Sequence, residues 1–422
     1  MALRGTGERG AALLTAMVAV AVLTAVATDL AYSSRVSLQI AASGRDELRA
    51  SWRARGGVNL ARLVLTFQQQ LDDAVPQGLA AGAGVSVPRL QLWQFVPVGA
   101  LAEALFTASA VPPAGGAGAA PPVALDAKIE DESKKVNAQL EGLGQTGDRK
   151  LWQQVQAIYQ LVCDPRWDPL FDREDAHRVR STRQDLIVRL RDWVSEGEQS
   201  SGLLLSGSSA PCGMVVGQPP FEAAFGDKNA PYDRGGSDER YRAKNNRMDS
   251  LDELFLVAGV GDAFMAAFRD SLTVYLPRDA KRNVNETDRA KLVELARVIA
   301  DPPLQPALLD PLFADRLGKA VSQKTLGGLF ALGPADFGTA VEAAGVHVNS
   351  ALLTGQNSPF TDRSTTFLVR ATGVAGGVES TIEAVVRLGQ TTTAGQALAA
   401  AGAAAGGATS APLPTIIHWR ED

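Results

Sequence analysis

The sequence predicts an α+β protein that begins with one long helix. A charge-free apolar run near the N-terminus passes directly into a helical pattern, further helical segments occupy the middle of the chain, and the last part alternates like a β-hairpin. The chain has 422 residues, and domains usually have about 100 to 200 residues. We therefore expect two or three domains rather than one compact core.

Composition narrows the class of protein. Hydrophobic residues make up 45% and charged residues 21%, which excludes wholesale disorder. The net charge is −5 and there is no long basic tail, so nucleic-acid binding is not expected. The three histidines and two cysteines lack metal-ligand spacing, and no zinc or iron–sulfur site is expected. Cys163 and Cys212 either form one disulfide in an oxidising compartment or are two unrelated apolar residues.

The N-terminus allows two processing alternatives. Residues 11–27 carry no charge, and this length is near the lower limit for a membrane span and also fits the core of a signal peptide. Cleavage after Ala25-Val26-Ala27 would release a soluble protein. Cleavage between Gly10 and Ala11 would keep the apolar run on the mature chain as a membrane helix.

The helical pattern after the apolar run favours the second alternative. Apolar or small residues recur at steps of three, four or seven and predict one face of an amphipathic helix: Leu38, Ala41, Leu48, Trp52, Gly56, Leu60, Leu63, Phe67 and Leu71. Residues 11–71 would measure about 90 Å if the helix is unbroken. Gly44, Gly56 and Gly57 weaken it locally. Such a helix suits a subunit that starts in a membrane and packs into a helical bundle.

The first half of the remaining chain alternates loops with short elements. Residues 108–123 are rich in proline, glycine and alanine and predict a loop, and residues 124–140 predict a strand with a charged turn. Helical patterns cover residues 151–162 and 184–194. Residues 200–231, rich in glycine, serine and proline, predict a second loop.

The second half contains a helix-hairpin-helix pattern and a β-hairpin. Residues 249–275 place a glycine turn between two apolar helices, and residues 326–345 echo this weakly. Residues 365–388 alternate on both sides of Gly376-Gly377 and predict a β-hairpin. Residues 390–410 are a low-complexity loop, and residues 415–419 predict an edge strand.

Together these segments resemble the K-type minor pseudopilin of type II secretion systems, general secretion pathway protein K. The resemblance extends from residue 9 to the C-terminus and depends on the order and spacing of its parts. The matching residues are Arg9-Gly10 before Ala11-Ala12-Leu13-Leu14, Asp29-Leu30-Ala31, Ile129-Glu130-Asp131-Glu132 with Lys135-Val136-Asn137, Asp192-Trp193-Val194, Asp238-Glu239-Arg240-Tyr241, Ser250-Leu251-Asp252-Glu253-Leu254 before Val257-Ala258-Gly259-Val260, Val385-Val386, and His418-Trp419-Arg420-Glu421.

One position favours the K subunit over other pseudopilins. Most pseudopilins carry a glutamate five residues into the mature chain, which pairs with a neighbour's terminal amine, whereas the K subunit lacks it. Here that position is Thr15. A carboxylate in hydrocarbon is costly unless paired, so its absence fits a subunit at the filament tip.

The resemblance implies a fold and a domain order. A long helix packs on an antiparallel sheet in a pilin-like domain, and a large, mostly helical domain is inserted into it. The implied segments are a prepilin leader (1–10), the transmembrane part of the helix (11–28), the first part of the pilin-like domain (29–149), the helical insertion (150–300) and the remainder with the β-hairpin and edge strand (301–422).

The resemblance also implies the chain's place and partners. The protein would be a single-pass inner-membrane protein with its C-terminal domain in the periplasm. It would be cleaved by prepilin peptidase, contact the inner-membrane secretion machinery and join other minor pseudopilins in a tip complex that initiates or caps a short pseudopilus and supports export of folded proteins. The family binds calcium, for which Asp238 and Glu239 are the candidate ligands. Ser195 and Gly197 replace aspartates that the family usually carries.

Two other functions remain as alternatives. A minor pilin of a type IV pilus would share the N-terminal helix, although the large insertion favours the K subunit. A membrane-anchored helix-hairpin-helix protein would bind DNA phosphates through the turn at Gly259-Val260-Gly261. An enzyme is not expected, because no G-x-S-x-G motif occurs and His177, His347 and His418 have no evident acid–base partner.

Overall fold

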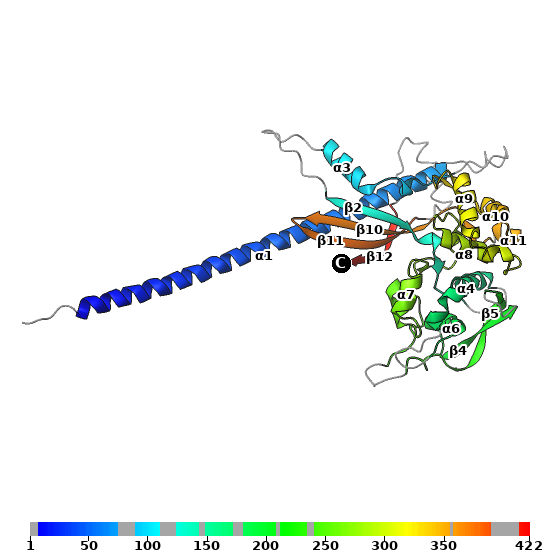
Figure 1. Cartoon of the computed structure of the whole chain (residues 1–422), viewed down its shortest axis with the longest axis horizontal. Coiled ribbons are helices and arrows are strands. Elements are labelled where there is room, and N and C mark those ends of the chain that lie inside the picture. Colours follow the sequence, from blue (N-terminus) through cyan, green and yellow to red (C-terminus); the bar gives the residue numbers. More distant parts are fainter. Residues whose placement is uncertain are drawn as a thin grey trace, which may run out of the picture.

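The computed structural model describes residues 7–74, 89–109, 124–142, 148–171, 180–207, 212–233, 240–354, 358–389 and 413–422. The first element, α1, is a continuous helix over Gly7–Ala74 with 68 residues, and is therefore about 100 Å long. Gly44, Gly56 and Gly57 do not interrupt it. Its first half projects away from the rest of the molecule and its second half lies on a sheet (Figure 1). This confirms the predicted long N-terminal helix.

The sheet against α1 is antiparallel with the strand order β12-β11-β10-β2. Its strands are β2 (Leu125–Asp131), β10 (Thr366–Ala375), β11 (Val378–Arg387) and β12 (Thr415–Glu421). Gly376 and Gly377, both at positive φ, form the turn between β10 and β11. The predicted β-hairpin and edge strand are confirmed, and so is the α+β class with the long helix packed on an antiparallel sheet.

Small residues bring α1 close to this sheet. The buried side of the helix contributes Ala54, Val58, Ala61 and Leu65 to a core shared with Phe367, Val369, Ala371, Ile382, Ala384 and Val386. The closest approach is at Gly373 of β10, where a methyl group would contact the carbonyl oxygen of Ala50 and lie 2.6 Å from the amide nitrogen of Ala54. Only glycine fits between this strand and the helix backbone.

The predicted apolar face of α1 is not the face that packs on the sheet. Trp52 is 67% exposed and Phe67 is 56% exposed, whereas Ala54 and Leu65 are fully buried. At 100° per residue, the predicted apolar face lies on the opposite side of the helix from Ala54, Val58, Ala61 and Leu65, which face the sheet. The close fit at Gly373 is made by Ala50 and Ala54, whereas Trp52 and Phe67 point away from the sheet.

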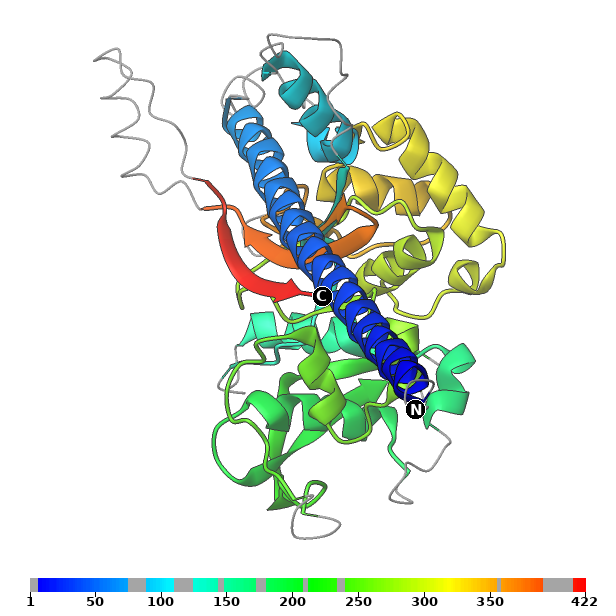
Figure 2. The ribbon, with the colours of Figure 1, turned by 90° about the vertical axis from the view of Figure 1, so that its left-hand side faces the viewer.

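Residues 132–365 leave the sheet after β2 and return to it at β10, and they form two separate hydrophobic cores. In Figure 2, the green core lies below the sheet and the yellow core lies beside it. Short elements join the remaining chain to the sheet and to the second core: β1 (Arg89–Leu90), η1 (Leu92–Gln94), α3 (Val98–Ser109) and η2 (Glu132–Lys134). The insertion is therefore bilobed.

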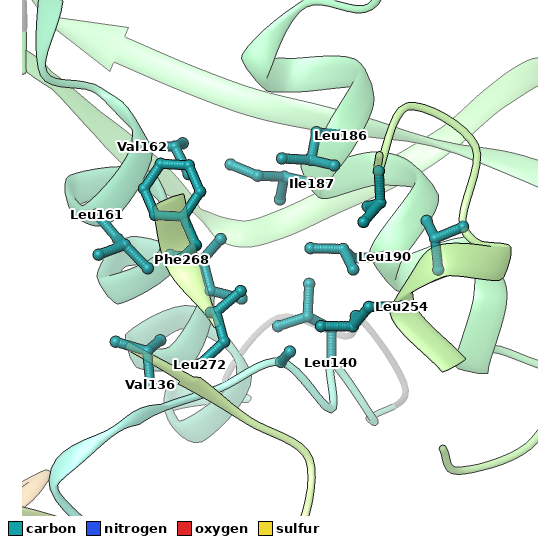
Figure 3. Packing of buried hydrophobic residues seen from close by; sticks show 14 of the residues in the cluster. Val136, Leu140, Leu161, Val162, Leu186, Ile187, Leu190, Leu254, Phe268 and Leu272 are labelled. Atoms are coloured by element: carbon teal, nitrogen blue, oxygen red, sulfur yellow. The ribbon is translucent and has the colours of Figure 1, made fainter. Parts of the chain in front are cut away.

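The first core packs helices against a long hairpin. Leu140, Leu186, Leu190, Leu254 and Phe268 converge at its centre (Figure 3). Its elements are β3 (Val136–Asn137), α4 (Arg149–Val162), η3 (Pro165–Trp167), α5 (Asp168–Phe171), α6 (Arg183–Val194), β4 (Gln199–Gly207), β5 (Met214–Asp227), η5 (Leu251–Leu256), α7 (Asp262–Phe268) and β6 (Leu272–Thr273). The predicted helices at 151–162 and 184–194 are confirmed.

The predicted loop at 200–231 was wrong, because β4 and β5 pair there as an antiparallel hairpin. Each strand has only the other as a described neighbour, and an edge strand tolerates prolines such as Pro219 and Pro220. A disulfide joins Cys163, at the end of α4, to Cys212, which lies before β5, with a Cα–Cα distance of 5.1 Å. This settles the open alternative for the cysteines.

The second core consists of four helices and short strands. They are β7 (Arg282–Asn283), α8 (Arg289–Ile299), η6 (Pro306–Leu309), α9 (Phe313–Thr325), β8 (Phe330–Ala331), α10 (Pro334–Ala343), α11 (Ser350–Leu353) and β9 (Phe360–Thr361). Because α8 packs on α9 and α10, the predicted end of the insertion at residue 300 divides this core. The predicted echo at 326–345 contains one helix, α10, because residues 330–331 pair with β1 as a strand instead.

Candidate membrane segment and assembly surface

The first part of α1 is long and apolar enough to cross a membrane. An 18-residue window within it has a mean hydropathy of 2.1, and none of that window is buried in the molecule. Leu13, Met17, Val20 and Leu23 are each more than 60% exposed. No charged residue occurs between Arg9 and Asp29. Such a surface is stable in hydrocarbon and unfavourable in water.

The polar side chains of this segment are satisfied within the helix. The hydroxyl of Thr15 donates to the carbonyl oxygen of Ala12 at 2.9 Å, and that of Thr24 donates to Val20 at 2.7 Å. Thr28 likewise donates to the carbonyl oxygen of Thr24. In a bilayer core, where no water is present, each polar group needs such an internal partner. Thr15 therefore occupies the fifth position after Gly10 without bringing a charge into the apolar segment.

The two candidate processing sites lie within the same helix. The backbone is helical from Gly7, so neither Gly10-Ala11 nor Ala25-Val26-Ala27 is marked by a break in α1. Helix geometry therefore does not distinguish the two cleavage alternatives. They differ in how much of α1 stays on the mature chain, and α1 continues without a linker from the apolar segment to the sheet.

The side of α1 that faces away from the sheet carries an exposed apolar stripe, which we define as Leu38, Leu48, Trp52, Leu63 and Phe67. All five side chains are at least 37% exposed. They lie on one helix face, where the exposed Arg45 separates Leu38 from Leu48. Large exposed apolar side chains gathered on one face mark interaction sites.

A shallow groove borders this stripe where α1 meets β12. Trp52, Arg55 and Asn59 of the helix and Ile416, Trp419 and Glu421 of the strand line a space of about 390 Å³. Arg55 forms an ion pair with Glu421 at 2.8 Å, and its guanidinium lies 5.2 Å from the Trp52 ring centroid. Because β12 pairs only with β11 among the described strands, its outer edge borders the same surface. Sequence reasoning did not find this groove.

Hydrogen bonds from helix side chains fix the second half of α1 to its surroundings. The Arg62 guanidinium donates twice to the carbonyl oxygen of Pro414, at 2.8 and 3.0 Å. The Gln68 amide donates to the carbonyl oxygen of Leu90 and accepts from the amide nitrogen of Leu92. Gln69 donates to the carbonyl oxygen of Gly389. These hydrogen bonds therefore fix the part of the helix that carries the end of the stripe.

The segment around Asp131 that carried part of the family resemblance is a buried structural junction. Its carboxylate accepts hydrogen bonds from the backbone N–H of Ser133 at 2.8 Å, from the Asn283 amide at 3.1 Å and from the Ser364 hydroxyl. Burial raises the pKa of Asp131. These partners join β2 of the sheet to β7 and to the chain entering β10, so the motif holds the insertion to the sheet.

The predicted calcium ligands, Asp238 and Glu239, lie outside the described residues. Within the described ranges, no group of three or more His, Cys, Asp or Glu side chains is placed to hold a metal ion. Asp192, from the matched segment before Trp193, instead accepts hydrogen bonds from the Ser200 hydroxyl at 3.0 Å and from the Ser201 amide at 3.1 Å. Calcium binding therefore remains a prediction.

The segment with the helix-hairpin-helix pattern packs into the first core. Its first helix is the 3-10 turn η5, and Val257, Val260 and Phe264 are buried in the core. At Gly259, a methyl group would lie 3.0 Å from both the Arg189 guanidinium and the Ser181 hydroxyl, so side chains cover Gly259, whereas Gly261 is exposed. The geometry gives no open phosphate-binding surface at Gly259.

No protein-family model matches the chain, and no curated protein matches it in sequence. Among solved structures, it is similar to a chain of the GspK-GspI-GspJ complex from the type 2 secretion system of enterotoxigenic Escherichia coli. The two share 13% sequence identity and a TM-score of 0.45. The match covers 90% of this chain and 99% of that chain.

Proposed function

We propose that the chain is a minor pseudopilin of a type II secretion system, held in the inner membrane by residues 11–28. The single observation that carries this proposal is α1, which is continuous from an unburied apolar segment to a half packed on the sheet. A cleaved signal peptide does not require this continuity. The role is one of assembly, without catalysis, and it supports export of folded proteins.

The exposed stripe of α1 supports packing in a filament. Leu48, Trp52 and Phe67 present apolar surface on the side that the sheet leaves free. The helices of other minor pseudopilins would cover this stripe and remove it from water. The inner-membrane secretion machinery and prepilin peptidase would act on the same helix before assembly.

The position of the insertion supports a place at the filament tip. Both cores of the insertion lie at the end of the molecule away from the apolar start of α1 (Figure 1). With the apolar start in the membrane, the bulk of the insertion lies at the far end. A subunit of this shape blocks addition of another subunit above it and thereby caps the filament or starts it.

The disulfide supports a periplasmic domain. Cys163 and Cys212 are bonded to each other, and disulfides persist in oxidising compartments such as the periplasm. Both cysteines belong to the first core of the insertion. With a single membrane span in α1, the folded part of the chain would then lie on the periplasmic side.

The mature N-terminus tests the proposal. The full chain is expressed in a host with prepilin peptidase, and the first mature residue is determined by mass spectrometry. We expect Ala11, and we expect Gly10→Leu to abolish that cleavage. Ala27→Leu is the matched control because it alters the alternative signal-peptidase site only. A mature chain that starts at Thr28 and is lost in Ala27→Leu contradicts the membrane-held filament subunit.

Calcium binding is a separate part of the proposal and depends on Asp238 and Glu239. Calcium needs six to eight oxygen ligands, so these two carboxylates would act with carbonyl oxygens or water. We expect a chelator to lower the melting temperature of the full chain, and Asp238→Asn/Glu239→Gln to remove that difference. An unchanged melting temperature with and without the chelator excludes a calcium site that stabilises the fold.

A further inference from the structure

A cleft separates the two cores of the insertion. It has a volume of about 590 Å³, within the usual size of ligand pockets. The start of α4 forms one wall, and residues 276–282 with residues 358–360 form the other. The cleft is not involved in the membrane and assembly roles proposed for α1.

Cations outnumber anions in the lining of the cleft, although the whole chain carries a net charge of −5. The cations are Lys135, Arg149, Lys150, Arg278, Lys281 and Arg282, and the anions are Asp148 and Asp279. Arg278 is neutralised by Asp148, and Lys135 by Glu132. Arg149 and Lys150 are exposed at the start of α4 and form no ion pair with the described residues.

Two amide side chains in the same wall have unused hydrogen-bonding atoms. The Nε2 donor of Gln153 and the Oε1 acceptor of Gln154 are buried, and neither has a partner in the described part of the chain. A buried polar atom without a partner is unfavourable. One donor and one acceptor in the same wall match a peptide group, which both accepts and donates.

One short sheet borders the cleft with a free strand edge. Residues of β3 line the cleft, and among the described strands β3 pairs only with β6, whereas the Phe360 N–H of β9 already donates to the Ser358 hydroxyl at 3.2 Å. An extended peptide can add to such an edge through its backbone. The apolar side chains of Trp152, Leu352 and Phe360 lie in the same lining and offer contacts to alternate side chains of a strand.

We propose that this cleft binds an extended acidic peptide segment of a partner protein. Arg149 and Lys150 pair with its carboxylates, and the two glutamines hydrogen-bond its backbone. A small inorganic anion would leave the apolar wall and the amide atoms unused, so a peptide fits the lining better. The inference does not depend on the membrane segment or on the position in a filament.

The test uses the full chain in detergent micelles and a short fluorescein-labelled peptide in which glutamates alternate with valines. Its twin carries glutamines in place of the glutamates. We expect saturable binding of the acidic peptide, weakened at high salt. We expect Arg149→Ala/Lys150→Ala to weaken binding about tenfold, because two charge pairs are lost. Lys319→Ala/Lys324→Ala, two exposed cations outside the cleft, is the control and leaves binding unchanged.

Three results would overturn the proposal. They are equal binding of the acidic peptide and its glutamine twin, equal binding by the wild type and the Arg149→Ala/Lys150→Ala variant, and tighter binding of inorganic phosphate or of single-stranded oligothymidylate than of the peptide. The comparison of the two peptides on the wild-type chain needs no variant to fold. A failure here leaves the mature N-terminus at Ala11 untouched, so it is distinct from a failure of the filament role.

Discussion

The two halves of α1 have the same secondary structure but different surroundings. Among the described side chains before Ala50, none is buried, whereas from Ala50 onward one side of the helix is buried against the sheet. The free half is the more apolar near its start, and the packed half contacts the sheet through Ala54, Val58, Ala61 and Leu65. Burial in this helix therefore follows the distance to the sheet and not hydrophobicity.

This comparison shows where binding surface remains. In the packed half, Ala54 is fully buried, while Trp52, only two residues earlier, is 67% exposed. A helix that had only to fold onto the sheet would place its largest apolar residue in the core, because burial of an aromatic side chain contributes most. The tryptophan on the outer face indicates a second contact beyond the sheet.

The largest effect on stability is expected where the backbones of α1 and β10 meet. Gly373→Ala places a methyl group against the backbone of Ala50 and Ala54, which has no side-chain freedom to move away. We expect a loss of about 3 kcal/mol in the free energy of unfolding, measured by chemical denaturation of the full chain in detergent.

The matched control for this prediction lies on the helix itself. Gly56 has no atom within 4 Å of an added methyl group, so Gly56→Ala should leave stability unchanged or raise it by about 0.5 to 1 kcal/mol. Equal effects of Gly373→Ala and Gly56→Ala would show that α1 does not approach β10 as closely as described.

A lysine introduced into either half of α1 tests which half lies in the membrane and which lies in water. Val20 is 62% exposed and Leu38 is 68% exposed, so the structure alone does not distinguish them. We expect Val20→Lys to lower membrane retention after alkaline carbonate extraction, because a lysine at the centre of a membrane helix costs about 2.5 to 3.5 kcal/mol. Leu38→Lys should have no such effect. Equal release by the two variants contradicts a membrane segment that ends near Thr28.

The exposed stripe should matter for assembly and not for folding. Leu48→Ser and Trp52→Ser remove exposed apolar surface, so each should change the free energy of unfolding by no more than about 0.5 kcal/mol. Both should reduce co-isolation of partner subunits from membranes, whereas the exposed polar control Glu47→Ser should not. Undiminished co-isolation in both stripe variants would exclude the stripe as the contact surface.

Local patterns predicted the elements that local physics determines. The hairpin at 365–388 follows from alternation around Gly376-Gly377, and α4 follows from the helical pattern over residues 151–162. The apolar segment and Thr15 lie in α1 as predicted. These features need no knowledge of distant contacts.

The features that the sequence did not predict depend on pairing between distant residues. The buried face of α1 depends on Gly373, more than 300 residues later in the chain, and the groove pairs Trp52 with Trp419. The hairpin of β4 and β5 was hidden by prolines that an edge strand tolerates. A hydrophobicity pattern identifies an apolar face, but it does not say whether a sheet, a membrane or a partner covers it.

The smallest effect on stability is expected at Asp72, near the C-terminal end of α1. Burial raises the pKa of Asp72 above its ordinary value of 3.8, and the hydrogen bond from Gln68, at 3.0 Å, only partly opposes this. The folded chain then binds this proton more tightly than the unfolded chain, so Asp72 lowers stability as the pH rises from 3.8 through its folded pKa.

Asp72→Asn removes this cost and keeps an oxygen for Gln68. We expect it to raise the free energy of unfolding at pH 7 by about 0.5 kcal/mol, a small gain because the side chain retains solvent contact. The difference from the wild type should shrink as the pH falls through the folded pKa of Asp72, since the wild-type carboxyl then becomes neutral. A gain that grows on acidification would show that Asp72 is stabilised as a carboxylate at the end of α1, and that the packed half does not exclude water from it.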